Sequence, residues 1–152
     1  MKALRPTILT VVIAVLPLLA RPGIMWERLT DEKLIEKSEV IVLAELAGQT
    51  RLMPSPDGPA LWLGALRVEE TLKGDSQQTV RLLLLPSPEA PRSSSDILYR
   101  DGQRGLWFLR ARPPGGDGLY LADHPQRFLA AAQAERIVEM REKIQGAAPQ
   151  QP

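Results

Sequence analysis

The chain has 152 residues, with 19 Lys and Arg against 18 Asp and Glu, a single His and no Cys. This length supports one hydrophobic core of modest size, and the net charge of +1 gives no electrostatic reason to bind nucleic acid or anionic lipid. The absence of Cys excludes a disulfide scaffold, thiolate metal sites, a cysteine nucleophile and a lipid-modified cysteine.

The N-terminus has the three-part pattern of a secretory leader. Lys2 and Arg5 supply positive charge, residues 7–20 are almost wholly apolar, and charge returns at Arg21. A membrane-spanning helix needs about 20 apolar residues, so this stretch is short for a permanent span. We therefore predict a signal peptide over residues 1–20 and export to the periplasm or the extracellular space.

The same residues allow two alternatives to a cleaved leader. Leu18 stands where a small side chain usually precedes a cleavage site, and apolar character continues through residues 24–26. In the first alternative the leader is not cleaved, and residues 1–20 serve as an N-terminal membrane anchor. The other alternative is a buried N-terminal helix of a cytosolic protein.

Capping signals predict a short helix over residues 31–37. Thr30 precedes two acidic residues, so a hydroxyl acceptor and two negative charges stand at the N-terminal end of the helix dipole. Leu29 and Leu34 have the spacing of a hydrophobic staple across the cap.

Two strands and a loop are predicted next. Residues 40–47 are β-branched and apolar up to Gly48, which suits a pleated strand. Residues 51–59 contain three prolines and a glycine and predict a loop, because these residues interrupt ladder pairing. In residues 60–72 apolar and charged side chains alternate, with Leu66 facing the core and Arg67 the solvent.

A tight turn at residues 73–75 leads into a return strand over residues 79–85. Apolar residues occupy both of its faces, with Leu83 and Leu85 opposite the inward set, so both sides should be covered. The proline-rich residues 86–95 predict a second loop.

Further along, residues 106–110 predict a strand and residues 119–121 its short hairpin partner, which is the last strand expected. After Pro125 the apolar period changes to three or four, which predicts an amphipathic helix packed on the sheet. Glu139 and Lys143 have the spacing of an ion pair on its wet side. The apolar stripe comprises Ala130, Ala134, Ile137, Met140 and Ile144, with Gly146 as the stop before a flexible tail over residues 147–152.

The order of these segments resembles a known group of exported domains. Its features are Val-Ile-Val-Leu at residues 40–43, the strand ending in Leu-Lys-Gly-Asp over residues 66–75, the strand over residues 102–109, and a short Gly-Leu-Tyr strand at residues 118–120. Across residues 31–129 the chain resembles small exported bacterial domains similar to the netrin and metalloproteinase-inhibitor group of OB-type barrels.

The resemblance implies a barrel of five or six strands with flanking helices, used for binding rather than for chemistry. The inhibitors in that group present an N-terminal cysteine to a catalytic metal, and this chain has none, so their mechanism does not transfer. We predict a mainly β (α+β) single domain over residues 21–146. It is a small OB-like β-barrel with a short N-terminal helix and a C-terminal amphipathic helix, preceded by the hydrophobic leader.

The sequence contains few residues with the spacing of a catalytic or metal-binding site. His124 lies in a turn beside Asp123, and we interpret it as a solvated turn residue, with a role as general base or metal ligand as the alternative. The Asp residues are scattered singly rather than at calcium-loop spacing, and no phosphate-binding loop is found. We predict no enzymatic activity, no cofactor and no metal.

Aromatic residues were considered as binding platforms. Trp107 is interpreted as core, and Trp62 either packs or stays exposed as a binding aromatic. A nucleic-acid groove lined by aromatic and basic residues was weighed, but an exported protein rarely meets nucleic acid, so none is predicted.

The loop over residues 93–104 is the predicted contact surface, with Tyr99, Arg100 and Arg104 as partner-binding residues, because Tyr and Arg are enriched at interface hot spots. An ordinary solvated loop is the alternative. We predict an exported, non-enzymatic binding or envelope-associated module whose partner is another protein or envelope component, with membrane contact only through an uncleaved N-terminus. The alternative function is a membrane-anchored structural accessory subunit that docks a partner through the C-terminal helix.

Overall fold

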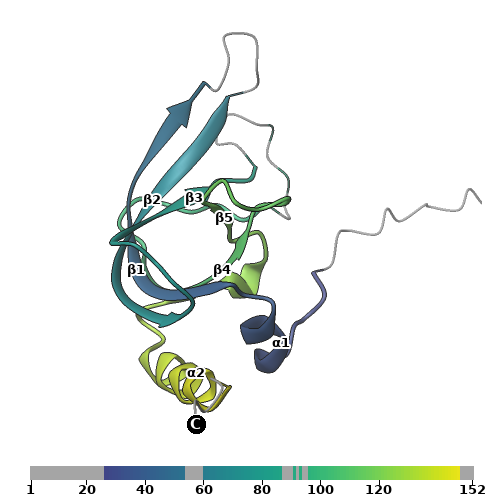
Figure 1. Ribbon diagram of the computed structural model, residues 1–152, viewed down its shortest axis with the longest axis vertical. Helices are drawn as coiled ribbons and strands as arrows, with labels where there is room; N and C mark the ends of the chain where they lie inside the picture. Colours follow the sequence, from purple (N-terminus) through teal and green to yellow (C-terminus); the bar gives the residue numbers. More distant parts are fainter. Residues whose placement is uncertain (1–25, 54–59, 87–90, 92, 94–95, 148–152) are drawn as a thin grey trace, which may run out of the picture.

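The computed structural model describes residues 26–53, 60–86, 91, 93 and 96–147 (Figure 1). The predicted leader, nearly all of the predicted C-terminal tail and most of the two predicted loops lie outside these residues. The elements in chain order are α1 (Asp31–Glu36), β1 (Val40–Leu52), β2 (Leu61–Lys73), β3 (Thr79–Leu83), β4 (Arg104–Ala111), β5 (Leu119–Leu121), the 3₁₀ turn η1 (Pro125–Arg127), β6 (Phe128–Ala130) and α2 (Ala134–Ala147).

Five of the strands close into a barrel, in the order β1-β2-β3-β5-β4 with β4 returning to β1 (Figure 1). The β3–β5 pair is parallel and the other pairs are antiparallel, while β6 pairs with the first part of β4 on the edge that β5 uses further along. A closed five-stranded barrel is the OB-type architecture. The predicted mainly β, OB-like fold with an N-terminal and a C-terminal helix is confirmed.

Closure depends on the bending of β1, which pairs with two strands at once. Its first half pairs with β4 from Val40–Leu109 to Glu45–Arg104, and its whole length pairs with β2. Three register shifts interrupt the β1–β2 ladder, the last of them between Leu46 and Gly48. Register shifts of this kind bend a strand and increase its twist, and a strand must bend in this way to close a barrel.

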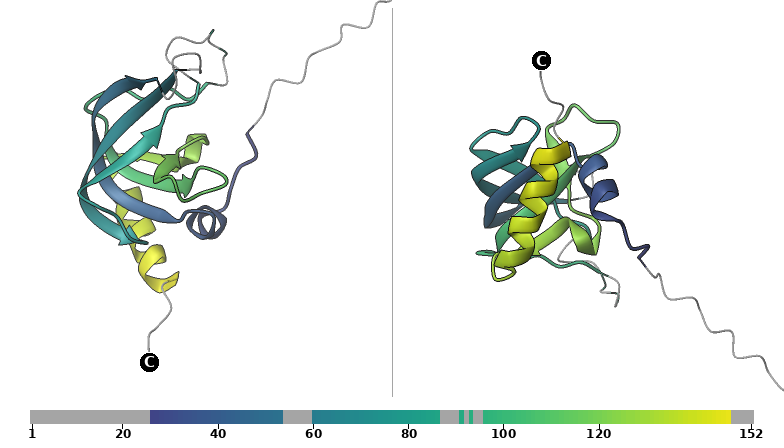
Figure 2. Two further views of the ribbon diagram at one scale, coloured as in Figure 1. Left: turned by 45° about the horizontal axis from the view of Figure 1, so that its top comes forward. Right: turned by 90° about the horizontal axis from the view of Figure 1, so that it is seen from below.

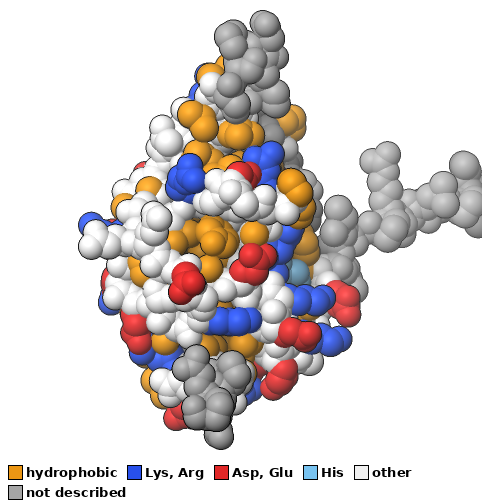
Figure 3. All heavy atoms as spheres, viewed as in Figure 1, with side chains coloured by type: hydrophobic (Ala, Val, Ile, Leu, Met, Phe, Trp, Pro, Cys, Tyr) orange, Lys and Arg blue, Asp and Glu red, His pale blue; other side chains and the backbone are white. Residues whose placement is uncertain are grey.

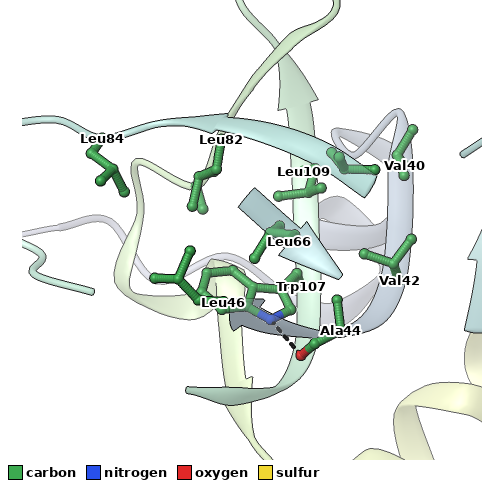
Figure 4. Packing of buried hydrophobic residues seen from close by; sticks show 11 residues of the cluster. Val40, Val42, Ala44, Leu46, Leu66, Leu82, Leu84, Trp107 and Leu109 are labelled. Carbon is green, nitrogen blue, oxygen red and sulfur yellow. Dashed lines mark hydrogen bonds between the residues drawn. The ribbon is translucent and has the colours of Figure 1, made fainter. Parts of the chain in front are cut away.

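Trp107 fills the centre of the barrel (Figure 4). Its side chain is 0% exposed, and its indole Nε1 donates a hydrogen bond of 3.0 Å to the carbonyl of Ala44. The predicted core position of Trp107 is therefore confirmed. The side chains around it come from alternate positions of the surrounding strands: Val40, Val42, Ala44, Leu46, Leu66, Val80, Leu82, Leu84, Leu109 and Ala122.

A second core lies on the outside of β1 and β4, under the two helices. Ile41, Leu106 and Phe108 face outward from the strands and are at most 1% exposed. The right-hand view in Figure 2 shows α2 lying across the strands with α1 beside it. The helices cover this face with Leu34, Ile35, Ile137, Met140 and Ile144.

Polar contacts hold α1 in place. The Thr30 hydroxyl accepts a hydrogen bond from the Lys33 N–H, so the predicted cap is confirmed. At the other end of α1, the Lys73 ammonium donates to the carbonyls of Ile35 and Ser38, each at 2.6 Å. Cations are favourable there because the last carbonyls of a helix lack intrahelical partners.

Asp31 links the two helices. Its carboxylate bonds Arg136 and Lys143 of α2. Burial by itself would raise the pKa of Asp31, but the hydrogen bonds from Lys143 and Arg136 outweigh it, so the pKa lies below its ordinary value. Lys143 was expected to pair with Glu139; Glu139 pairs instead with Arg136, because α1 brings a more buried carboxylate to Lys143.

Several predicted boundaries were wrong in the first half of the chain. β1 runs through Gly48 to Leu52, because residues 48–52 pair with the start of β2 and the hairpin ladder outweighs the local preference for a loop. β3 ends at Leu83, and Leu85 is 51% exposed rather than covered.

Two predictions near the C-terminus also need correction. Ala130 lies in β6, a short strand that the sequence did not predict, so the predicted hairpin partner at residues 119–121 is not the last strand. The helix starts at Ala134 and continues past Gly146 to Ala147. A strand of three residues is too short for its apolar pattern to be told apart from the start of the helix that follows.

The close approach of β6 to β4 requires glycine at position 105. A Cβ added to Gly105 would lie 2.1 Å from the Leu129 carbonyl oxygen, whereas one added to Gly48 meets nothing within 4 Å. We therefore expect Gly105→Ala to lower the free energy of unfolding by about 1–3 kcal/mol, because backbone must move to relieve the clash. Urea denaturation would measure it. Gly48→Ala is the matched control and should change stability by less than about 0.5 kcal/mol; equal effects would contradict the proposed clash.

Candidate functional site

Four chain segments meet at the end of the barrel where β1 leads into β2. Leu52 pairs with Leu61, and the Leu84 N–H donates to the Trp62 carbonyl at 2.8 Å. The Gln49 side-chain amide donates to the Tyr99 carbonyl at 3.2 Å, which brings the segment before β4 to the same place. We call this region, together with the turn that leads into β4 beside Leu46, the loop end and define it by Leu52, Met53, Leu85, Leu98 and Arg100.

Large apolar side chains are exposed at the loop end. Leu52, Met53, Leu85 and Leu98 have exposed fractions of 46%, 48%, 51% and 40%. Only two other large apolar side chains among the described residues are exposed, and these lie elsewhere on the fold. Figure 3 shows hydrophobic side chains reaching the surface near the hairpin formed by β1 and β2. Gathered exposure of this kind is typical of interaction surfaces.

Trp62 closes the barrel interior beneath this surface. Its ring is partly buried and packs against the inner core, which confirms the packing interpretation. Its indole Nε1 is buried and has no hydrogen-bond partner. An unpaired buried N–H is destabilising, so the aromatic packing of Trp62 outweighs an unsatisfied donor.

Tyr99 faces the barrel rather than the solvent. Its ring lies 4.9 Å from that of Trp107 and 6.0 Å from that of Phe128, and its hydroxyl donates to the Ala122 carbonyl at 2.6 Å. Burial raises the pKa of the Tyr99 phenol, with the charge of Asp123 adding to the effect. The expectation that the Tyr99 ring faces a partner is therefore corrected. The Tyr99 ring packs in an aromatic cluster with Trp107 and Phe128 and so anchors the segment before β4 to the barrel. The sequence alone does not show that these three rings meet.

Arg104 lies on the outer surface and is fully engaged there. Its guanidinium makes two hydrogen bonds to Glu69, at 2.6 and 2.5 Å. These bonds hold the pKa of Glu69 below its ordinary value. The neighbouring strands add a second pair, Arg67 with Glu45 at 2.9 Å, so this face carries a cross-strand ladder of paired charges.

Arg100 is the one predicted contact residue that the structure leaves exposed and unpaired. Its backbone N–H donates to the Gln103 side chain at 2.8 Å, and its guanidinium makes no ion pair with any of the described residues. It follows Leu98 by two positions, so a positive charge borders the apolar surface. The structure thus brings Arg100 to the loop end and leaves Tyr99 and Arg104 in structural roles.

Arg127 is a buried residue that the sequence analysis missed. It is 4% exposed and donates to the Phe108 carbonyl at 3.0 Å, the Ser38 hydroxyl at 3.2 Å and the Lys37 carbonyl at 3.4 Å. These bonds tie η1 to β4 and to the C-terminal end of α1. No local pattern predicts this role, because Ser38 and Lys37 lie about ninety positions away.

Asp123 shares this network. Its carboxylate bonds Arg110 and lies 3.7 Å from the Arg127 guanidinium. Burial alone would raise the pKa of Asp123, but the hydrogen bonds and charge of Arg110 outweigh it, so the pKa lies below its ordinary value. The Asp123 carboxylate therefore supplies the negative charge that the buried Arg127 guanidinium needs.

His124 has structural partners on both ring nitrogens. Its Nδ1 accepts a hydrogen bond from the Gln126 N–H at 3.2 Å, so Nε2 carries the proton and donates to the Glu27 carbonyl at 2.9 Å. The residue caps η1, which confirms its predicted place in a turn, but its ring is bonded to the protein rather than solvated as predicted. The Trp26 ring also contacts it in a T-shaped arrangement, with 5.4 Å between ring centroids.

The described part of the chain holds neither a cluster of metal ligands nor a helix able to span a membrane. There, no three His, Asp or Glu side chains converge in a way that could hold a metal ion. No helix there combines the length and the apolar character needed to cross a bilayer. Comparison of the sequence with protein-family models and with curated proteins finds no match.

The lowered pKa values of Asp31 and Asp123 predict acid sensitivity. Each carboxylate stabilises the fold above its unfolded pKa of about 3.9, and this contribution is lost as pH falls through the lower folded pKa. We expect urea denaturation to show a free energy of unfolding that falls between pH 5 and about pH 2. The fall should be smaller in Asp123→Asn than in the unchanged protein. Asp75→Asn, in the exposed β2–β3 turn, is the control; if all three proteins respond alike, Asp123 contributes nothing.

Proposed function

We propose that this protein is an exported, non-enzymatic binding module that contacts another protein or envelope component through the loop end. The barrel is the scaffold. Trp107 and the surrounding aliphatic side chains fill its interior, and the two helices cover the outer face of β1 and β4. The surface offered to a partner is the end where the connecting segments meet. Rigid barrels that carry recognition on their loops are a common arrangement for binding proteins.

The observation that carries this proposal is the gathering of exposed apolar side chains. Four of the six large apolar side chains exposed in the described chain belong to the loop end, and they come from three separate segments: the end of β1 with the residue after it, the second residue after β3, and the segment before β4. Isolated exposed apolar residues are ordinary on protein surfaces, but four of them on segments that converge at one end of the barrel point to a surface that a partner covers.

Charge limits the kind of partner. Arg100 lies at the margin of the apolar surface and has no carboxylate partner among the described residues. A partner that places apolar side chains on Leu52, Met53, Leu85 and Leu98, with a carboxylate near Arg100, would satisfy both features. Arginine at the rim of an apolar contact is typical of protein interfaces.

The state of the single histidine supports a non-enzymatic role. Both ring nitrogens of His124 are engaged in hydrogen bonds that hold η1 and residue 27, so the ring serves the fold. A general base needs a ring nitrogen directed at a substrate proton.

The alternative function is a membrane-anchored accessory subunit that docks its partner through α2. The apolar stripe of α2 packs against its own sheet through Ile137, Met140 and Ile144. Val138 is the exposed large apolar residue on its outer side. Because α2 uses its apolar stripe within the fold and exposes only Val138 among its large apolar residues, we favour the loop end as the contact surface. Crosslinking from each surface in turn distinguishes the two functions.

We expect photo-crosslinking in the native host to capture a partner from the loop end. A photoreactive residue at position 98 should give a discrete adduct in the exported fraction, and the same residue at position 138 should give none. Mass spectrometry of the adduct identifies the partner. An adduct only from position 138, on a membrane-retained chain, would support the accessory-subunit alternative and contradict our proposal.

Substitutions at the loop end should weaken that complex without affecting the fold. Leu85→Ser and Leu98→Ser remove exposed apolar contacts, and Arg100→Glu reverses the marginal charge. Each should lower affinity for the captured partner by roughly ten-fold or more, while the free energy of unfolding changes by less than about 0.5 kcal/mol. Titration calorimetry measures the affinity. Arg28→Glu is the matched control, because Arg28 is exposed on the far side beside α1; equal losses in both charge variants would indicate a non-specific charge effect.

A further inference from the structure

The first described residues of the chain are held against η1 by side chains that bind their main-chain atoms. The Gln126 side-chain oxygen accepts a hydrogen bond from the Leu29 N–H at 2.7 Å, and its amide donates to the Leu29 carbonyl at 2.8 Å. Both main-chain groups of one residue are therefore paired by one glutamine, as a neighbouring β-strand would pair them.

His124 adds a third contact two residues earlier. Its Nε2 donates to the Glu27 carbonyl at 2.9 Å, and its ring contacts the Trp26 ring edge to face. The Leu29 side chain is partly buried against the outer core, while the side chains of Glu27 and Arg28 are exposed. The contacts thus use main-chain atoms and two apolar side chains spaced three apart.

The orientation of Gln126 and His124 is set by the fold and not by residues 26–29. His124 caps η1 by accepting from the Gln126 N–H, and the next residue, Arg127, is anchored in the interior. Grooves of about 500 and 660 Å³ flank residues 26–29, and Trp26 and His124 line both. The receiving surface is therefore a groove built by the barrel and crossed by the N-terminal segment.

We propose that Gln126 and His124 form a peptide clamp for non-helical main chain, and that residues 26–29 of this chain are its occupant. The clamp holds the entry of the chain beside α1, away from the β1–β2 hairpin (Figures 1 and 2). The clamp is independent of the proposed partner-binding function, because no residue of the loop end takes part in it.

Amide hydrogen exchange of the full chain tests the clamp directly. The Leu29 N–H is protected by its bond to Gln126, so Gln126→Leu should speed its exchange by roughly ten-fold. Gln126→Glu keeps the acceptor oxygen and loses only the donor, so it should give a smaller increase, and it serves if the leucine variant folds poorly. Gln133→Leu is the matched control, since Gln133 lines the same groove without bonding Leu29. Exchange of the Leu106 N–H, in the core of β4, reports global opening.

The result expected is faster exchange at Leu29 in both Gln126 variants, with Leu106 unchanged and the Gln133 variant like the unchanged protein. Unchanged Leu29 exchange in Gln126→Leu would overturn the proposal, as would an equal increase in Gln133→Leu. A second variant tests whether main-chain atoms carry the contact: Glu27→Ala combined with Arg28→Ala should leave Leu29 protected. Loss of protection in that variant would show that side chains hold the segment and would overturn the clamp.

Discussion

The pairing of β1 with both β2 and β4 is the constraint on which the rest of the structure depends. A strand that pairs on both edges while turning through the barrel wall must bend, and the register shifts along β1 supply that bend. Closure then places alternate β1 residues around Trp107, whose indole bonds the Ala44 carbonyl. It also turns Ile41 outward, where the helices cover it. One strand therefore supplies both cores.

Buried and half-buried charges attach the remaining elements to this barrel. Arg127 and Lys73 donate to the last carbonyls around the end of α1, and Asp31 joins α1 to α2. Such groups are costly to desolvate, and hydrogen bonds or nearby opposite charges offset that cost; the Arg127 Nε has no hydrogen bond but lies 3.7 Å from the Asp123 carboxylate. A six-residue helix has little stability of its own, and these contacts explain why α1 keeps a fixed place.

The surface divides into regions with different chemistry. The outer face of β1, β2 and β4 carries paired charges such as Arg104 with Glu69, which leave little unsatisfied charge for a partner. The η1 side holds residues 26–29 through Gln126 and His124. The loop end carries four of the six exposed large apolar side chains of the described chain together with the exposed Arg100, and there the barrel is best suited to meet another molecule.

Local pattern determined much of this protein from its sequence. The cap at Thr30, the alternation around Leu66, the core position of Trp107 and the apolar face of α2 all follow from neighbours within a few residues. The OB-like barrel was also predicted, but through the resemblance of residues 31–129 to known OB-type domains, because local pattern gives strands and not their closure. Tertiary structure alone decided the rest: the inward turn of Tyr99, the pairing of Arg104, the burial of Arg127 and the bonds of Gln126 to Leu29. Each depends on a partner between 23 and 97 positions away, and such partners meet only when the barrel has closed.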